Sequence, residues 1–318
     1  MLSIVLPKGS LERATLELFE AADLPVVRSS SVDYRASIDD PRVGEVRILR
    51  PQEIPVYVAE GLFDLGITGR DWVTETSSDV VSLGELRYSK ATSEPVRVVV
   101  AVAGDSPVES VSDLPDGVRV ASEYPEMTKR YFAERGVAAD VRLSYGASEA
   151  KIPDIADCVV DITETGRALR AAGLRVIDTI LTSWTEVVAN PVAYADPERR
   201  RAMEQLMVLL NGALDARGKV LLKLNVSASR RDDVLAVLPS AKSPTINQLA
   251  NGDFAIGFLR DPLSPTPFGE SCMDFRGIAE ADFQSTTVDT GVDFSMMALI
   301  KTQGLHTFVD AGAAPILF

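Results

Sequence analysis

Residues 154–170 read D-I-A-D-C-V-V-D-I-T-E-T-G-R-A-L-R, and this stretch decides the class of fold. Residues 158–162 are mostly apolar and β-branched, which predicts a buried strand with one carboxylate, Asp161, near its end. The T-E-T-G sequence at 163–166 predicts a turn. The apolar residues after it recur at helical spacing up to Gly173, which predicts a short helix. A strand that turns directly into a helix is typical of α/β proteins.

The start of that helix is a candidate phosphate site, because free backbone N–H groups at a helix N-terminus attract anions. The two threonine hydroxyls of the turn add further hydrogen-bond donors. The two acidic side chains beside them suit a ligand that has both a phosphate and free hydroxyls, or one that binds together with Mg²⁺. A sugar phosphate meets this description. The candidate residues are Asp161, Thr163, Glu164, Thr165, Gly166, Arg167 and Ala168. An ordinary strand, turn and helix capped by a threonine is the structural alternative.

Composition restricts the possible classes of protein. The 318 residues are 46% hydrophobic, enough for two or three domains with their own cores. Lys and Arg number 32 against 46 Asp and Glu, a net charge of −14. This charge argues against nucleic-acid and anionic-membrane partners. Two cysteines and a single histidine, His306, leave no disulfide framework, histidine metal cluster or well-supported serine hydrolase triad.

The chain contains no apolar run long enough to span a membrane, and its apolar N-terminal stretch before Pro7 and Lys8 is too short for a signal-peptide core. We therefore expect a cytoplasmic protein.

Strands and helices alternate along residues 1–92, which predicts a largely parallel sheet covered by helices. Ligands of such sheets bind at the carboxyl ends of the strands. Three predicted strands end in notable side chains: Lys8 after the first, Arg50 after the second and Asp71 after the third. Each also has an ordinary interpretation, as a solvated charge or a helix cap.

Residues 93–183 repeat the α/β pattern and predict a second lobe, and residues 184–216 return to the first lobe through a strand and a long helix. One strand of the second lobe is followed by Tyr124, which could stack on a base or fill the core. Two lobes whose strand ends face one cleft predict a small-ligand site between them.

Residues 217–318 predict a separate α+β module. We expect strands at 219–226, 254–259 and 306–310, and helices at 231–238 and 294–302. Residues 260–293 are rich in Gly, Ser, Thr and Asp with weak periodicity, which indicates an insertion.

Five separated segments in this order resemble the ATP phosphoribosyltransferase family in its long form. They are P-K-G-S-L at 7–11, L-R-P-Q-E-I-P-V-Y-V at 49–58, D-L-G-I-T-G-R-D at 64–71, A-S-E-Y-P at 121–125 and A-D-C-V-V-D-I-T-E-T-G-R-A-L at 156–169. V-L-L-K-L-N-V at 220–226 and K-S-P-T at 242–245 are similar to the family's C-terminal domain. The resemblance covers residues 1 to about 254. Ser10 stands where many members have arginine, and Ala168 where the family usually has a second threonine of the turn.

The resemblance implies an α/β fold, with a two-lobed, periplasmic-binding-protein-like catalytic core and a C-terminal ACT-like α+β regulatory domain. It implies transfer of the phosphoribosyl group of 5-phosphoribosyl diphosphate to N1 of ATP, with Mg²⁺ present, as the first step of histidine biosynthesis. It also implies a homo-oligomer, from dimer to hexamer, that histidine inhibits. The residues implied are the turn already named for 5-phosphoribosyl diphosphate; Lys8, Arg50, Asp71 and Tyr124 for the nucleotide; Glu149 for ribose or metal; and Ser243 and Thr245 for histidine.

Two other classes of protein fit parts of the pattern. A non-enzymatic two-lobed small-ligand-binding protein shares the predicted architecture, since fold alone does not fix function. A prephenate dehydratase with an amino-acid-sensing domain has a similar layout, but its Thr-Arg-Phe motif is absent from this sequence.

Overall fold

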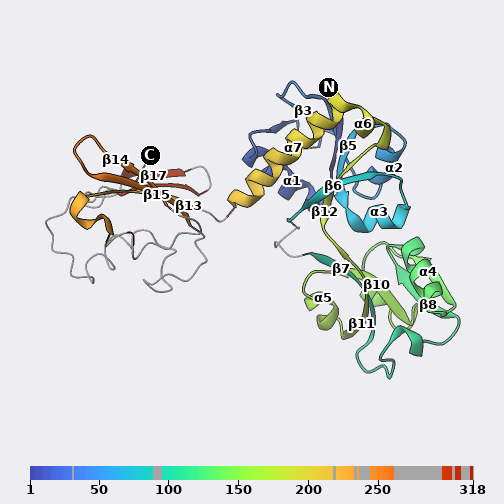
Figure 1. Ribbon diagram of the computed structural model, residues 1–318. Helices are drawn as coiled ribbons and strands as arrows, with labels where there is room; N and C mark the ends of the chain where they lie inside the picture. Colours follow the sequence, from blue (N-terminus) through green and yellow to red (C-terminus); the bar gives the residue numbers. More distant parts are fainter. Residues whose placement is uncertain are drawn as a thin grey trace. The chain divides into compact units, whose positions relative to one another are not determined.

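The computed structural model describes residues 1–30, 32–88, 95–217, 220–232, 235, 244–260, 296–302, 305–308 and 316–317. Within these ranges, only the backbone is described at 148–149, 220–224, 258–260 and from 296 onward. The chain divides into two compact units, Met1–Leu214 and Asp215–Phe318 (Figure 1). No helix of the described residues is long and apolar enough to cross a membrane.

The first unit contains two lobes, each built on its own sheet. The first lobe has a seven-stranded sheet in the order β2-β3-β4-β1-β5-β12-β6. Its centre is parallel, because β1 pairs in parallel with both β4 and β5. The elements are β1 (Leu2–Pro7), α1 (Glu12–Ala21), β2 (Val26–Val27), β3 (Arg35–Ile38), β4 (Val43–Leu49), α2 (Ile54–Ala59), β5 (Leu65–Gly69), α3 (Arg70–Thr76), β6 (Val81–Leu86), β12 (Thr185–Ala189), α6 (Pro191–Ala195) and α7 (Pro197–Ala216).

Helices cover both faces of this sheet (Figure 1). On one face, α1 and the long helix α7 bury apolar stripes against β1, β4 and β5. The α7 stripe consists of Met203, Leu206, Met207 and Leu210, with Leu214 packed beside it, and the α1 stripe contains Leu18 and Phe19. On the other face, α2 packs through Ile54 and Val58 against Val5 of β1 and Val188 of β12.

The second lobe has a five-stranded sheet in the order β11-β7-β10-β8-β9. Its elements are β7 (Val96–Ala103), β8 (Val118–Ser122), α4 (Pro125–Glu134), β9 (Ala139–Leu143), β10 (Cys158–Thr163), α5 (Arg167–Ala171) and β11 (Leu174–Ser183), with short 3₁₀ turns at Val111–Asp113 and Ser148–Lys151. Helix α4 covers one face of the sheet and α5 the other. The strand, turn and helix expected at 158–173 are therefore present.

Both sheets are mixed rather than largely parallel, which corrects the sequence-based expectation. β7 is antiparallel to β10 and β11, and β12 is antiparallel to β5 and β6. Part of the reason lies in the path of the chain, which enters the second lobe along β7 and returns along β11 and β12, with only Trp184 between the last two strands. In the first sheet, β3 is also antiparallel to both β2 and β4. The sequence predicts the return strand, but residue types alone do not show in which direction it pairs with its neighbours.

The second unit contains a six-stranded sheet in the order β14-β15-β13-β16-β17-β18. Its elements are β13 (Val220–Val226), a 3₁₀ turn (Ala228–Arg230), β14 (Thr245–Gln248), β15 (Phe254–Arg260), β16 (Met296–Thr302), β17 (Leu305–Phe308) and β18 (Ile316–Leu317). The helix expected at 294–302 is wrong, because residues 296–302 form the strand β16, which pairs with β13. Met, Ala and Leu favour a helix locally, and the ladder to β13 overrides that preference. The proposed insertion and Cys272 lie outside the described residues, as does most of the helix expected at 231–238.

The close packing of α2 on β5 generates a stability prediction. A Cβ at Gly66 would lie 2.7 Å from Cγ2 of Ile54 and 2.8 Å from Cγ2 of Val58. We expect Gly66→Ala to lower the free energy of unfolding by about 1–3 kcal/mol through overpacking, measured by urea denaturation. Gly212→Ala is the matched control, since its Cβ would meet nothing within 4 Å in helix α7. It should be stabilising by up to about 1 kcal/mol, and equal losses in both variants would contradict this packing.

Candidate active site

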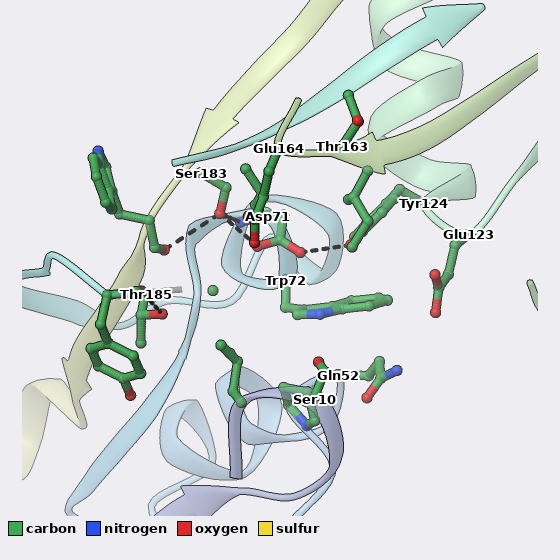
Figure 2. Close-up of a pocket in the computed structure, with 17 residues that line it drawn as sticks. Ser10, Gln52, Asp71, Trp72, Glu123, Tyr124, Thr163, Glu164, Ser183 and Thr185 are labelled. Carbon is green, nitrogen blue, oxygen red and sulfur yellow. Dashed lines mark hydrogen bonds between the residues drawn. The ribbon is translucent and has the colours of Figure 1, made fainter. Parts of the chain in front are cut away.

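A cavity of about 340 Å³ lies between the two lobes of the first unit (Figure 2). The first lobe contributes Ser10, Gln52, Asp71 and Trp72, the second lobe contributes Glu123, Tyr124, Thr163 and Glu164, and the return crossing contributes Ser183 and Thr185. These residues come from the carboxyl ends of β5, β8 and β10 and from the turn before α2. The cavity is therefore at the place that the α/β pattern predicts for a ligand.

Asp71 is the buried carboxylate of this cavity, with a side chain that is 5% exposed. It lies in the first turn of α3, directly after β5. Its Oδ1 accepts a hydrogen bond from Oγ of Ser183 at 2.6 Å, and its Oδ2 accepts one from the Tyr124 hydroxyl at 2.7 Å (Figure 2). A Cβ on residue 69 would lie 2.1 Å from Oδ1, so this carboxylate position requires glycine at 69. Asp71 thus joins the first lobe to the crossing and to the second lobe.

Burial is the largest cause of the shifted pKa values of Asp71 and Tyr124. It raises the pKa of Asp71, and the hydrogen bonds from Ser183 and Tyr124 oppose that rise only in part. The pKa of Tyr124 is raised well above its ordinary value, first by burial and then by the neighbouring Asp71 charge. Tyr124 therefore remains a neutral hydrogen-bond donor to Asp71.

Tyr124 is a core residue as well as a wall of the cavity, since it is 1% exposed. Its ring centroid lies 4.5 Å from that of Trp72, with the planes tilted by 37°. Its backbone N–H donates to Oγ of Ser122 at 2.9 Å, and that hydroxyl also bonds Thr128 at 2.8 Å. The ring is fixed by these contacts, and its hydroxyl is already used by Asp71.

A second contact between the lobes lies one helical turn away, at Glu75 of α3. Its carboxylate accepts from the backbone N–H of Glu126 at 2.9 Å and of Met127 at 2.8 Å. These are N–H groups of the first turn of α4, which have no acceptor inside their own helix. Arg130 of α4 in turn donates to the carbonyl oxygen of Thr74 at 2.5 Å. Helices α3 and α4 therefore hold the two lobes together beside the cavity.

Two residues of the Thr-Gly turn, Thr163 and Glu164, line the cavity from the second lobe. Oγ1 of Thr163 accepts a hydrogen bond from the backbone N–H of Gly166 at 2.7 Å. Gly166 has a φ of 71°, a conformation that favours glycine, and it caps α5. One of the N–H groups expected to meet a phosphate is thus bound to the turn itself. Those of Arg167 and Ala168 follow at the start of α5, and the Arg167 N–H has a long contact of 3.4 Å with Oγ1 of Thr165.

The other candidate residues occupy varied positions. Nζ of Lys8 lies 4.2 Å from the ring centroid of Tyr34, and Arg50 is exposed at the end of β4. Asp161 accepts from the N–H of Ile162 at 2.7 Å, and its charge reaches Glu123. Thr245 begins β14 in the second unit. The Glu149 side chain and Ser243 lie outside the described residues.

Several wall residues carry no signal in the sequence, namely Gln52, Trp72, Glu123 and Ser183. Glu123 is half-buried, and burial together with the charges of Asp161 and Asp71 raises its pKa. A hydrogen bond from Gln52, across the cavity, opposes that rise. These four wall residues all lie close to the end of a strand. Many other residues of the chain do so too, and the sequence therefore does not single them out.

A two-lobed α/β core with a polar cavity between its lobes is an architecture of enzymes and binding proteins that act on small ligands. Residues 50–212 match the family model of ATP phosphoribosyltransferase, and residues 216–256 match the model of its C-terminal domain. The chain therefore belongs to the ATP phosphoribosyltransferase family. It is accordingly an enzyme, and the non-enzymatic binding protein is not favoured.

Individual relatives agree with the family assignment. The chain is 49% identical to the ATP phosphoribosyltransferase of Pelotomaculum thermopropionicum, over 80% of this chain and 86% of that protein. It is 48% identical to that of Desulforudis audaxviator over the same shares. The ATP phosphoribosyl transferase (HisG:HisZ) complex from Thermotoga maritima contains a chain that superposes with a TM-score of 0.58 at 25% identity, over 68% of this chain and 99% of that one.

The burial of Asp71 generates a prediction about pH. The folded state binds its proton more tightly than the unfolded state, whose aspartate pKa is about 3.9, so this group loses stabilising effect as pH rises from about 4. We expect the free energy of unfolding of the wild type to fall relative to that of Asp71→Asn as pH rises through this window. Denaturant titrations at several pH values measure the difference. Ser183→Ala retains the carboxyl group and should retain the pH dependence, whereas a pH-independent difference for Asp71→Asn would contradict the assignment.

Proposed function

We propose that the cavity binds ATP and 5-phosphoribosyl diphosphate and transfers the phosphoribosyl group to N1 of the adenine, as the first step of histidine biosynthesis. The observation that carries the proposal is that two residues of the Thr-Gly turn, Thr163 and Glu164, line the same cavity as Asp71 and Trp72 of the first lobe, in a chain of this family. The bond from ribose C1 to the diphosphate oxygen breaks, and a bond from C1 to N1 forms. The diphosphate leaves with the electron pair of the broken bond.

This chemistry depends on positioning and on charge more than on a strong base. A ribosyl centre that loses diphosphate gains positive charge, which fixed carboxylates stabilise electrostatically. Glu164 lies in the wall, and Asp161 lies close enough to influence Glu123. We assign Asp161, Thr163 and Thr165 to the ribose 5-phosphate group. Asp161 would accept from the ribose hydroxyls, and the threonine hydroxyls would donate to the phosphate together with the N–H groups of Gly166, Arg167 and Ala168. Lys8, Arg50, Asp71 and Tyr124 are assigned to the nucleotide side, and Glu149 to ribose or metal.

Mg²⁺ is proposed as the companion of the diphosphate. The residues found to line the cavity include Asp71, Glu123 and Glu164 and no lysine or arginine. Two highly charged anions entering such a cavity require a counter-charge, and Mg²⁺ is usually bound through substrate phosphates with one or two carboxylates. No group of three or more Asp, Glu, His or Cys side chains in the described residues forms a metal site. The ion would thus arrive mainly on the substrate and neutralise the leaving group.

Regulation and assembly form the remaining part of the proposal. We propose a cytoplasmic homo-oligomer, from dimer to hexamer, in which histidine binds the second unit through Ser243 and Thr245 and inhibits the transfer. The match to the family's C-terminal domain at 216–256 supports the presence of the regulatory module.

The reaction can be followed through the ultraviolet absorbance of the N1-substituted product, with ATP, 5-phosphoribosyl diphosphate, Mg²⁺ and pyrophosphatase. We expect product with the wild type and at least a tenfold loss in kcat/KM for Asp161→Ala, since hydrogen bonds to charged groups are worth about 1.5–3 kcal/mol. Asp105→Ala is the control and should remain active. Asp105 is exposed and follows the last residue of β7, whereas Thr163 pairs with the beginning of that strand. If calorimetry shows that both substrates bind but no product forms, the proposed transfer is rejected. Added histidine should reduce the rate.

A further inference from the structure

Helix α4 begins without a capping residue of its own. Its N-cap position is occupied by Tyr124, where a short polar residue such as serine or aspartate is usual. Pro125 has no N–H, and the N–H of Thr128 binds the carbonyl oxygen of Tyr124 in the ordinary helical pattern. The N–H groups of Glu126 and Met127 are thus the two that require an acceptor, and an N-cap side chain normally supplies it.

The first lobe supplies this missing cap through Glu75, the penultimate residue of α3. Glu75 is buried, and each of its two carboxylate oxygens accepts from one of the two N–H groups, those of Glu126 and Met127. A carboxylate at this end of α4 also interacts favourably with the positive pole of the helix dipole. Separation of the two lobes would remove both of these effects at once.

The exchange of caps is reciprocal, because α4 binds the C-terminal end of α3. Arg130 of α4 donates to the carbonyl oxygen of Thr74 at 2.5 Å and to Oγ of Ser77, the C-cap residue of α3, at 3.2 Å. The carbonyl oxygens of a last helical turn have no partner within their own helix, and a cation there suits the negative pole of the dipole. Each helix therefore provides the charged cap of the other.

The start of α4 also carries two residues of the cavity wall. Glu123 and Tyr124 directly precede the helix, and both line the cavity. Tyr124 donates to Asp71, which lies one helical turn before Glu75 on the same face of α3. The seating of α4 on α3 therefore decides where these wall residues stand relative to the first lobe.

We propose that Glu75 and Arg130 form a clasp that keeps the two lobes closed through protein contacts alone and so holds the cavity in its ligand-binding arrangement. Both are positioning residues, since they act through α4 and Tyr124. The inference rests on the proposed function only for the identity of the ligands. If the clasp is lost, part of the free protein has its lobes apart, and a ligand that contacts both lobes binds more weakly in proportion to the closed fraction.

Two variants of the full-length protein test the clasp by steady-state kinetics. Glu75→Gln keeps the length of the side chain and retains one acceptor oxygen in place of two, whereas Arg130→Ala removes both donors from an exposed residue. We expect the KM values of ATP and 5-phosphoribosyl diphosphate to rise about tenfold, the scale of one lost hydrogen bond to a charged group. The kcat values should remain within about twofold of wild type, because saturating substrates close the lobes again.

Amide hydrogen exchange of the free protein tests the clasp without any substrate. Arg130 contacts neither the N–H of Glu126 nor that of Met127, so faster exchange of these amides in Arg130→Ala reports separation of the lobes rather than loss of a direct bond. We expect about tenfold faster exchange at these two positions in both variants. Exchange of β8, in the core of the same lobe, should be unchanged.

Glu134→Ala is the matched control, since Glu134 is the exposed last residue of the same helix. It should retain the kinetic constants and the exchange rates of the wild type. Thermal unfolding checks that every variant is folded.

The outcomes separate this inference from the proposed function. Unchanged exchange of the Glu126 and Met127 amides in Arg130→Ala overturns the clasp, whether or not the protein is active. Lower kcat with unchanged KM in both variants also overturns it, because a partly unfolded sample gives that pattern. Faster exchange in both variants of a protein whose wild type forms no product supports the clasp and rejects the proposed function alone.

Discussion

The carboxylate of Asp71 is the contact on which the arrangement of the cavity depends. It accepts hydrogen bonds from Ser183, at the end of the return strand β11, and from Tyr124, in the second lobe. Removal of this carboxylate would leave two buried hydroxyls without their acceptor, which is costly. The charge is held by neutral donors rather than by a cation, and burial therefore raises its pKa. Gly69 makes the position possible, because any larger residue there would collide with the carboxylate.

The contact between α3 and α4 extends the same principle over one further helical turn. Glu75 satisfies two N–H groups of α4 that would otherwise lack acceptors. Two carboxylates of one helix, at spacing i and i+4, thus both bind the second lobe. The spacing places them on one face of α3, and this face contacts Tyr124 and the first turn of α4.

The electrostatic character of the cavity differs from what its proposed ligands suggest. Its lining is acidic where described, and the turn in its wall uses one N–H, that of Gly166, for its own hydroxyl contact with Thr163. The turn is therefore pre-shaped by Thr163 before any ligand binds. A metal ion that arrives with the diphosphate would reconcile acidic walls with anionic substrates.

The sequence by itself determined the α/β class, the strand and helix at 158–171, the long helix after the second lobe, and the family. These depend on local periodicity and on residue types at fixed spacing, which the sequence displays directly. It did not predict β16, because Met, Ala and Leu suit both helix and strand and only pairing with β13 decides between them. Mixed strand directions were likewise set in part by the two crossings of the chain. The tertiary structure alone decided that Tyr124 donates to Asp71 and that the backbone N–H of Glu126 donates to Glu75, because these partners are separated by 53 and 51 residues and belong to different lobes. A sequence identifies residues at strand ends, whereas which of them meet across a cavity depends on how the two lobes pack.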